Sequence, residues 1–200
     1  MAQRDPEKLK VFVTHVLAEP HYVERDRIEV HTLQARAEPL EETPPTVGLI
    51  GWTVDVQKDR IETMCIGWAP QMEPYVLEWE PHEGDPSQED CWRSALSHIR
   101  QSPWGAASFV GFDTGYLTDH VWRQIDAWGR KLAGTRLFGV KGLGGPGRQV
   151  VTKPGRPTDR RKRLPWQIGT DTAKDMILSH GVRVPVPPGG PGAVHFSSAL

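Results

Sequence analysis

The chain has 200 residues, of which 38% are hydrophobic, and a formal net charge of −1 at pH 7. This length suffices for one domain with a buried core and some appended segments, and no apolar run approaches the about 20 residues that a membrane span needs. No signal peptide opens the chain, and Cys65 and Cys91 stand without a CxxC pair, which excludes a disulfide framework and a cysteine-rich zinc site.

Residues 1–46 are predicted to form an arm or linker that leads into the folded core. Apolar residues at helical spacing between Leu9 and Leu17 predict a short amphipathic helix. Residues 38–45 (Glu-Pro-Leu-Glu-Glu-Thr-Pro-Pro) indicate an extended connector. We therefore expect a linker over residues 1–46 and a single folded domain over residues 47–200.

Three strands are predicted at the start of this domain. Residues 47–56 are mostly apolar and β-branched, as is typical of a central strand. Residues 61–68 and 74–79 follow after short turns. Strands joined by such short connections form an antiparallel meander.

Helices and strands then alternate. A helix is expected after Ser87, which has Asp90 three residues on as in a helix N-cap. Residues 106–112 are predicted as a strand, residues 118–132 as a helix and residues 136–140 as a strand. The resulting order β-β-β-α-β-α-β is that of an α/β ribonuclease H-like fold. In that fold, three antiparallel strands and then parallel strands form one mixed sheet flanked by helices.

A basic segment follows, and the charge of the chain is unevenly distributed. Residues 1–100 hold 10 Lys and Arg against 19 Asp and Glu, a net charge of −9, whereas residues 130–163 hold 11 Lys and Arg against Asp159 alone, a net charge of +10. This density favours contact with nucleic acid, and a solvated flexible loop is the alternative. The candidate DNA-binding residues are Lys141, Arg148, Lys153, Arg156, Arg160, Arg161, Lys162, Arg163 and Lys174.

Glycines are frequent at the start of this segment. Residues 142–147 (Gly-Leu-Gly-Gly-Pro-Gly) lack the Gly-Lys-Ser/Thr ending of a phosphate-binding loop. We therefore expect a hinge there, and no ATPase motif in this chain.

Three aspartates each end a short apolar run: Asp55, Asp113 and Asp171. Ligands of α/β sheets gather at the carboxyl ends of strands, and the first and fourth strands of a ribonuclease H-like sheet are neighbours, so Asp55 and Asp113 are expected side by side. Carboxylates this close repel each other unless a cation lies between them. The predicted cofactor is Mg²⁺ or Mn²⁺, as two ions that activate water against a phosphodiester.

Simpler roles remain open for these residues. Asp55 could merely end a strand, Asp113 could be a turn residue, and Asp171 could cap the helix expected after it. Asp175, one turn later, competes with Asp171 as third ligand. His195, in a strand-like tail, is a candidate for acid–base catalysis or substrate contact.

Several short motifs in fixed order resemble phage terminase large subunits of the GpA (lambda-like) family, in the C-terminal nuclease region. They are residues 54–60 (Val-Asp-Val-Gln-Lys-Asp-Arg), 84–86 (Gly-Asp-Pro), 112–116 (Phe-Asp-Thr-Gly-Tyr), 169–175 (Gly-Thr-Asp-Thr-Ala-Lys-Asp) and 190–196 (Gly-Pro-Gly-Ala-Val-His-Phe). Residues 9–14 resemble the segment that joins the motor to the nuclease in that family.

This resemblance implies a ribonuclease H-like, metal-dependent endonuclease domain that cuts concatemeric viral DNA during packaging. Asp55, Asp113 and Asp171 match its acidic ligands. The implied partners are double-stranded DNA, the motor ATPase domain of the same protein, the small terminase subunit and the portal, with no membrane. The implied location is the host-cell cytoplasm. A non-catalytic DNA-clamping module and a resolvase- or transposase-like nuclease of the same fold are the alternatives.

Overall fold

The structure is a computed structural model that describes residues 34–155, 163–178 and 194–200. The chain divides into two compact units, residues 1–30 and residues 31–200, and all described residues belong to the second. The helix predicted between Leu9 and Leu17 lies outside the described residues. The domain boundary at residue 46 remains a prediction.

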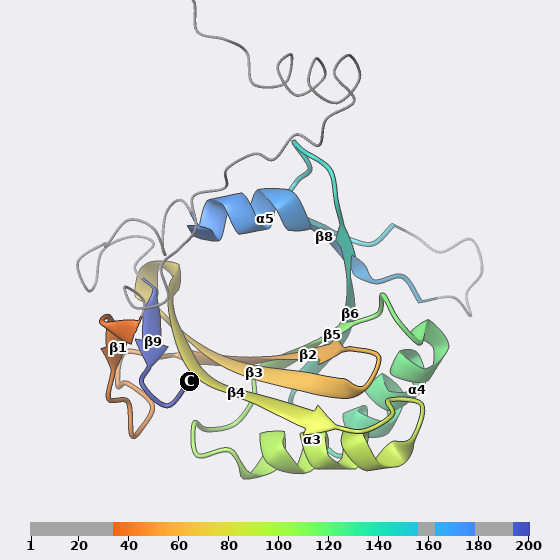
Figure 1. Cartoon of the computed structure of the whole chain (residues 1–200), viewed down its shortest axis with the longest axis horizontal. Helices are drawn as coiled ribbons and strands as arrows, with labels where there is room; N and C mark the ends of the chain where they lie inside the picture. The colour runs from red at the N-terminus through yellow and green to blue at the C-terminus, as the bar shows by residue number, and fades with distance from the viewer. Residues whose placement is uncertain (1–33, 156–162, 179–193) are drawn as a thin grey trace, which may run out of the picture. The chain divides into compact units, whose positions relative to one another are not determined.

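Strands of the described residues form one mixed sheet in the order β1-β9-β4-β3-β2-β5-β6-β8-β7 (Figure 1). β2, β3 and β4 form an antiparallel meander, and β2, β5, β6 and β8 run parallel to one another. The strands are β1 (Ala37–Glu38), β2 (Leu49–Val56), β3 (Arg60–Ala69), β4 (Glu73–Glu83), β5 (Phe109–Asp113), β6 (Arg136–Leu143), β7 (Val151–Thr152), β8 (Trp166–Gly169) and β9 (His195–Ser197).

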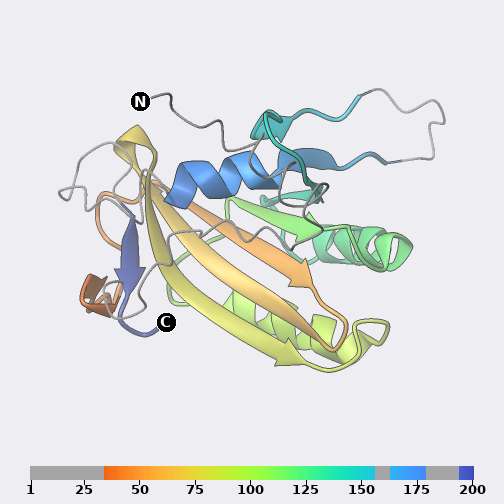
Figure 2. The ribbon, with the colours of Figure 1, turned by 45° about the horizontal axis from the view of Figure 1, so that its top comes forward.

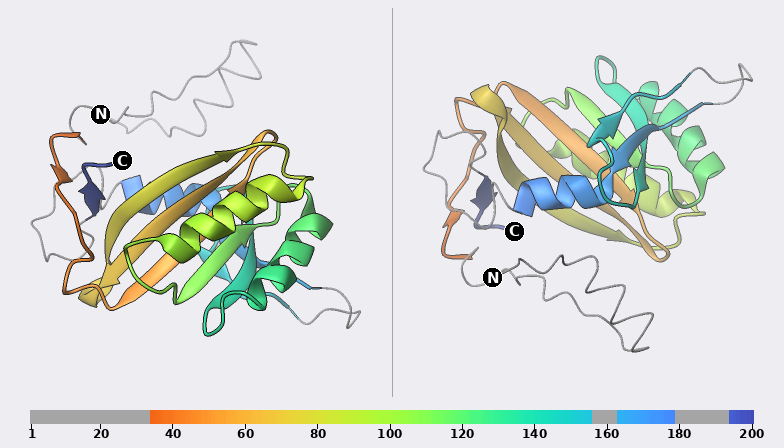
Figure 3. Two further views of the ribbon diagram at one scale, coloured as in Figure 1. Left: turned by 90° about the horizontal axis from the view of Figure 1, so that it is seen from below. Right: turned by 90° about the horizontal axis from the view of Figure 1, so that it is seen from above.

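Helices lie on both sides of this sheet. α3 (Glu89–Gln101) and α4 (Thr118–Gly129) cover one face, and α5 (Thr170–Ile177) lies on the other side (Figure 3). A single 3-10 turn, η2 (Pro70–Met72), joins β3 to β4. No helix within the described ranges is long and apolar enough to cross a membrane.

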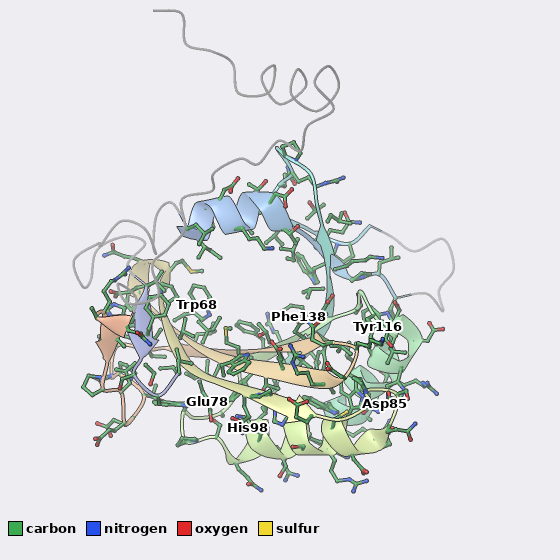
Figure 4. The ribbon with its side chains drawn as sticks, viewed as in Figure 1. Trp68, Glu78, Asp85, His98, Tyr116 and Phe138 are labelled. Carbon is green, nitrogen blue, oxygen red and sulfur yellow. The ribbon has the colours of Figure 1, made fainter. Side chains whose placement is uncertain are left out.

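Successive side chains of each strand point to opposite faces of the sheet, so alternate residues are buried. On β2, Trp52 and Val54 are buried against α3 and α4, whereas Asp55 is only half-buried and points to the α5 side. Aromatic side chains fill the helical side: the rings of Phe112 and Trp128 meet edge to face, 5.1 Å between centroids. In Figure 4, Phe138 lies on the α5 side of the sheet, away from this core.

The predicted order of elements is confirmed, and the fold is that of a ribonuclease H-like mixed sheet. The third strand is longer than predicted. β4 runs to Glu83 because a bulge opposite Cys65 and Ile66 absorbs one extra residue and lets pairing with β3 continue. The basic segment over residues 130–163 contains β6, which runs beyond the predicted strand end to Leu143, and the short strand β7.

The predicted N-cap at Ser87 is wrong. The carboxylate of Asp85 accepts hydrogen bonds from the backbone N–H of Ser87 (2.8 Å) and from its hydroxyl (2.8 Å), so Ser87 belongs to a turn. α3 begins two residues later, at Glu89, after Gln88, whose side chain makes no capping hydrogen bond.

Strands far apart in the sequence close one edge of the sheet. β9 pairs in parallel with β1 and with β4, so residues 37–38, within the predicted arm, lie in the sheet beside the end of the chain (Figure 2). Arg36 adds a hydrogen bond from Nη2 to the carbonyl oxygen of Val194 (3.3 Å).

Candidate active site

Asp55 and Asp113 lie next to each other near the carboxyl ends of β2 and β5. These strands pair in parallel with Val54 opposite Phe112, so the two aspartates come next in the same register. Both follow a residue that is buried on the helical side, which places both carboxylates on the α5 side of the sheet. The two carboxyl groups are close enough to share a hydrogen bond.

The surroundings of Asp55 oppose its negative charge. Burial raises the pKa of its carboxyl group, a hydrogen bond from Gln57 lowers it, and the charges of Asp113 and Glu62 raise it further; the net pKa lies above the usual 3.8. Two carboxylates held so close need a shared proton or a cation. The pair is therefore suited to binding a positively charged ligand.

Asp113 is held by the turn that follows β5. Its Oδ1 accepts a hydrogen bond from the backbone N–H of Gly115 (2.9 Å), so the turn role considered for Asp113 exists alongside its place in the pair. Thr114 anchors the turn to β6, because its backbone N–H and its hydroxyl both donate to the carbonyl oxygen of Val140 (2.8 and 2.9 Å). A side chain at position 115 would crowd the Asp113 carboxylate, since an added Cβ would lie 3.2 Å from Oδ1.

Asp171 makes a different contact. It lies in the first turn of α5, whose N-cap is Gly169, so the helix-cap alternative is wrong. Its Oδ2 accepts a hydrogen bond from the backbone N–H of Gly145 (2.9 Å), which adopts the left-handed φ of +114° in the connection from β6 to β7. Asp171 thus ties this connection to α5.

The structure does not join the third carboxylate to the pair. Asp113 lies opposite Val140 of β6, and Val140 lies opposite Trp166 of β8. Asp171 comes five residues after Trp166 in the chain. Asp175 is exposed on α5. Across residues 34–155, 163–178 and 194–200, no three His, Cys, Asp or Glu side chains are grouped closely enough to hold a metal ion.

His195 lies far from the aspartates. His195 lies opposite Tyr75 of β4, and Tyr75 lies opposite Gly67 of β3. Asp55 lies opposite Glu62, which precedes Gly67 by five residues on β3. Five residues of strand correspond to about 17 Å. The buried His195 ring stacks on Tyr75, with its nitrogens 2.5 Å from Glu38 Oε1 and 2.8 Å from Glu73 Oε1.

The candidate DNA-binding residues that the structure describes lie around β6, β7, β8 and α5. Lys141, Lys153 and Lys174 are exposed on β6, after β7 and on α5, respectively. Arg148 Nε donates to the carbonyl oxygen of Gly144 (2.6 Å), and Arg163 pairs with Asp126 (2.5 Å). Arg156, Arg160, Arg161 and Lys162 lie outside the described residues.

Two neighbours of Asp55, and a partner of one of them, were not identified from the sequence. The amide of Gln57 donates from Nε2 to Asp55 Oδ2 (2.5 Å). Glu62 faces Asp55 across the β2–β3 pair, and Arg60 donates from Nε to Glu62 Oε1 (2.7 Å). Glu62 could have been found from the predicted turn between the first two strands. Two residues that face each other in a hairpin lie at equal distances from its turn.

The sheet order and a carboxylate pair on neighbouring strand ends define a protein of the ribonuclease H-like class. The chain belongs to the family "Terminase large subunit gpA, endonuclease domain", whose sequence profile matches residues 1–200. This confirms the resemblance seen in the short motifs.

Two terminase large subunits illustrate the relationship. The chain is 27% identical over 202 residues to "Terminase, large subunit" of Enterobacteria phage P21, covering 93% of this chain and 30% of that protein. It is 26% identical over 204 residues to "Terminase, large subunit" of Escherichia phage lambda, covering 96% of this chain and 31% of that protein. The chain thus spans under a third of the length of these relatives.

Proposed function

We propose that this domain is a divalent-metal-dependent endonuclease that cuts concatemeric double-stranded DNA during viral genome packaging. The observation that carries the proposal is the pair of Asp55 and Asp113 carboxylates at adjacent strand ends. Membership in the endonuclease-domain family supports the same reaction.

The residues present fit a hard cation. The pair offers oxygen donors only, as Mg²⁺ and Mn²⁺ prefer, and the two charges repel each other without a cation. Such ions, when bound, would supply a water of lowered pKa and neutralise the leaving oxygen of the phosphodiester. Asp55 and Asp113 would hold them, while Gly115 keeps the Asp113 carboxylate oriented.

A second ion would need further oxygen ligands. Asp171 and Asp175 are the candidates, because α5 lies on the side of the sheet (Figure 3) to which the alternation of β2 and β5 directs the pair. Joining the pair would require Asp171 to move toward it, since its Oδ2 is tied to the N–H of Gly145 and the structure does not group it with Asp55 and Asp113. We propose that this happens when DNA lies along the basic residues of β6, the β7–β8 connection and α5.

The packaging partners are proposed from the family alone. Both relatives are named large subunits of a terminase. We propose that this domain works on DNA delivered by a motor ATPase domain of the same protein, together with a small terminase subunit and the portal, in the host-cell cytoplasm.

The test is plasmid cleavage by the purified protein with Mg²⁺ or Mn²⁺. We expect nicked and linear products that disappear with EDTA and with Asp55→Ala. The matched control is Asp90→Ala, which removes an exposed carboxylate on α3 that pairs only loosely with Arg93 (3.5 Å) and should leave cleavage unchanged. The proposal fails if DNA stays intact with both metals, or if Asp55→Ala cuts as well as the parent protein.

A non-catalytic DNA-clamping module is the second candidate. The observation in its favour is that, among the described residues, no three carboxylate or other metal-ligating side chains are grouped closely enough to hold a metal ion. Tight DNA binding without cleavage, at any concentration of either metal, would support this candidate.

A further inference from the structure

Gln57 contacts the candidate metal-binding pair from the turn that follows β2. Its backbone N–H donates to the carbonyl oxygen of Arg60 (3.0 Å), which closes the turn between β2 and β3. Its side chain reaches back along β2, so that Nε2 lies 2.5 Å from Asp55 Oδ2. The contact is partly buried.

This hydrogen bond completes a symmetrical arrangement. Asp113 has Oδ1 held by the backbone N–H of Gly115, and Asp55 has Oδ2 held by the Gln57 amide. Each carboxylate thus has one oxygen engaged by a donor from its own turn. A carboxylate has two oxygens with about four acceptor positions, so acceptor capacity remains on each for a shared ligand.

Gln57 is also suited to this place by its charge. Glu62 and Asp113 already surround Asp55 with negative charge. A neutral amide donates a hydrogen bond to Asp55 without competing, as a Lys or Arg would, for the place of a cation. The turn does not depend on the side chain, because the Gln57–Arg60 bond is made by the backbone.

We propose that Gln57 is a positioning residue that fixes the rotamer of Asp55 and thereby presents its carboxylate to a divalent cation shared with Asp113. This inference rests on the proposed function, because it assumes that the pair binds metal. Donors that orient metal-ligating side chains typically contribute 10- to 100-fold to metal affinity.

The test is Mn²⁺ binding by calorimetry, without DNA, to the full chain and to Gln57→Leu. Leucine removes the donor and keeps a side chain of similar size. We expect Mn²⁺ affinity to fall at least tenfold, while the unfolding temperature in EDTA shifts by less than about 3 °C. Plasmid cleavage should fail at limiting Mn²⁺ and recover at saturating Mn²⁺.

Two further variants make the test specific. Gln101→Leu is the matched control, because it removes a glutamine amide that donates to Ser97 Oγ (3.0 Å) on the exposed surface of α3, and it should bind Mn²⁺ like the parent protein. Gln57→Asn shortens the amide by one methylene and should weaken Mn²⁺ binding even if Gln57→Leu fails to fold.

The outcomes separate this inference from the proposed function. If the parent protein binds Mn²⁺ and cuts DNA while both Gln57 variants bind Mn²⁺ within twofold of it, the positioning role is overturned and the nuclease stands. If both variants lower the unfolding temperature strongly, Gln57 is a structural residue and the inference is also overturned. If the parent protein neither binds Mn²⁺ nor cuts, both proposals fall together.

Discussion

Asp55 lies where burial and two neighbouring carboxylates all oppose its charge. A sequence selected for stability alone would place a neutral residue there, because unpaired buried charge is costly. Functional sites commonly keep such unfavourable groups since the reaction needs them. The single hydrogen bond from Gln57 reduces this cost without removing it.

Asp171 allows a sharp test of its role at the residue level. Its carboxylate oxygen accepts from the N–H of Gly145, and an Asn side-chain oxygen could accept the same bond. Asp171→Asn should therefore leave the unfolding temperature almost unchanged, whereas Asp171→Ala should lose about 1 kcal/mol of stability. If Asp171 joins the metal site during the reaction, Asp171→Asn should nevertheless lower plasmid cleavage at least 100-fold.

The comparison of the two variants decides between ligand and structural roles. Full cleavage by Asp171→Asn would show that Asp171 serves only to tie the β6–β7 connection to α5. Asp175→Asn, one turn further along α5, should be assayed beside it as the competing ligand.

The residues of the site could be predicted only in part. Asp55 and Asp113 stand out because a charge ends an apolar run, and the adjacency of their strands follows from the order of elements. The contact of Asp171 with Gly145 could not be predicted, because it depends on a left-handed glycine and on the path of a long connection. Gln57 was missed because an amide two residues after a carboxylate has no distinctive pattern.

Among the elements, β9 lies between β1 and β4, and one buried histidine fastens it to both strands. Burial lowers the pKa of His195, but hydrogen bonds to Glu73 and Glu38 and the charges of both raise it more, so the net pKa lies above 6.5. A protonated ring can donate to both carboxylates at once. His195 thus joins β9 to β1 and β4 and has a structural role in this position.

This contact predicts a pH dependence of stability. Because the folded pKa of His195 is raised, its stabilising contribution is complete below about pH 6.5 and is lost as the pH rises through the folded pKa. Thermal unfolding followed from about pH 6 to about pH 9 should show this loss. At the acidic end, His195→Asn should be about 2 kcal/mol less stable than the parent protein. It should also lack the loss of stability that the parent protein shows as the pH rises.

His120→Asn on α4 is the control, since its ring contacts Arg123, Gln124 and Trp92 on the helical side, away from β9. If His195→Asn loses as much stability with rising pH as the parent protein does, another group causes the pH dependence.

The elements themselves were largely predictable because the hydrophobic period changes clearly along the chain. Trp52 and Val54 alternate with polar residues on β2, and the apolar stripe of α4 repeats at helical spacing. The parallel pairing of β9 with β1 could not be predicted, because it joins residues about 160 positions apart through two- and three-residue strands. Such pairing depends on tertiary packing that local sequence does not encode.

At the scale of the whole molecule, positive charge gathers beside the candidate site. Lys141, Lys153 and Lys174 are exposed on elements at the β6–β8–β7 side of the sheet, which continues from β5 and Asp113. Contacts of this kind follow the phosphate backbone and carry little sequence information. DNA affinity should therefore depend strongly on salt.

If the proposed DNA binding uses these lysines, its salt dependence reports how many of them contact phosphates. The triple variant Lys141→Ala, Lys153→Ala, Lys174→Ala should reduce the slope of log K against log salt by about 2–3. The matched control removes three cations around a groove on the α3 side: Arg93→Ala, Arg100→Ala, Lys131→Ala. Equal reductions in the two variants would contradict a DNA path on the α5 side.

We expect Asp55 and Asp113 to bind a divalent cation jointly. The most direct measurement is a crystal structure of the protein soaked with Mn²⁺, with anomalous scattering recorded at the manganese edge. We predict a manganese peak about 2 Å from a carboxylate oxygen of each aspartate, which disappears in Asp113→Asn. A peak only elsewhere, or none at this pair at saturating Mn²⁺, would show that Asp55 and Asp113 do not share a divalent cation.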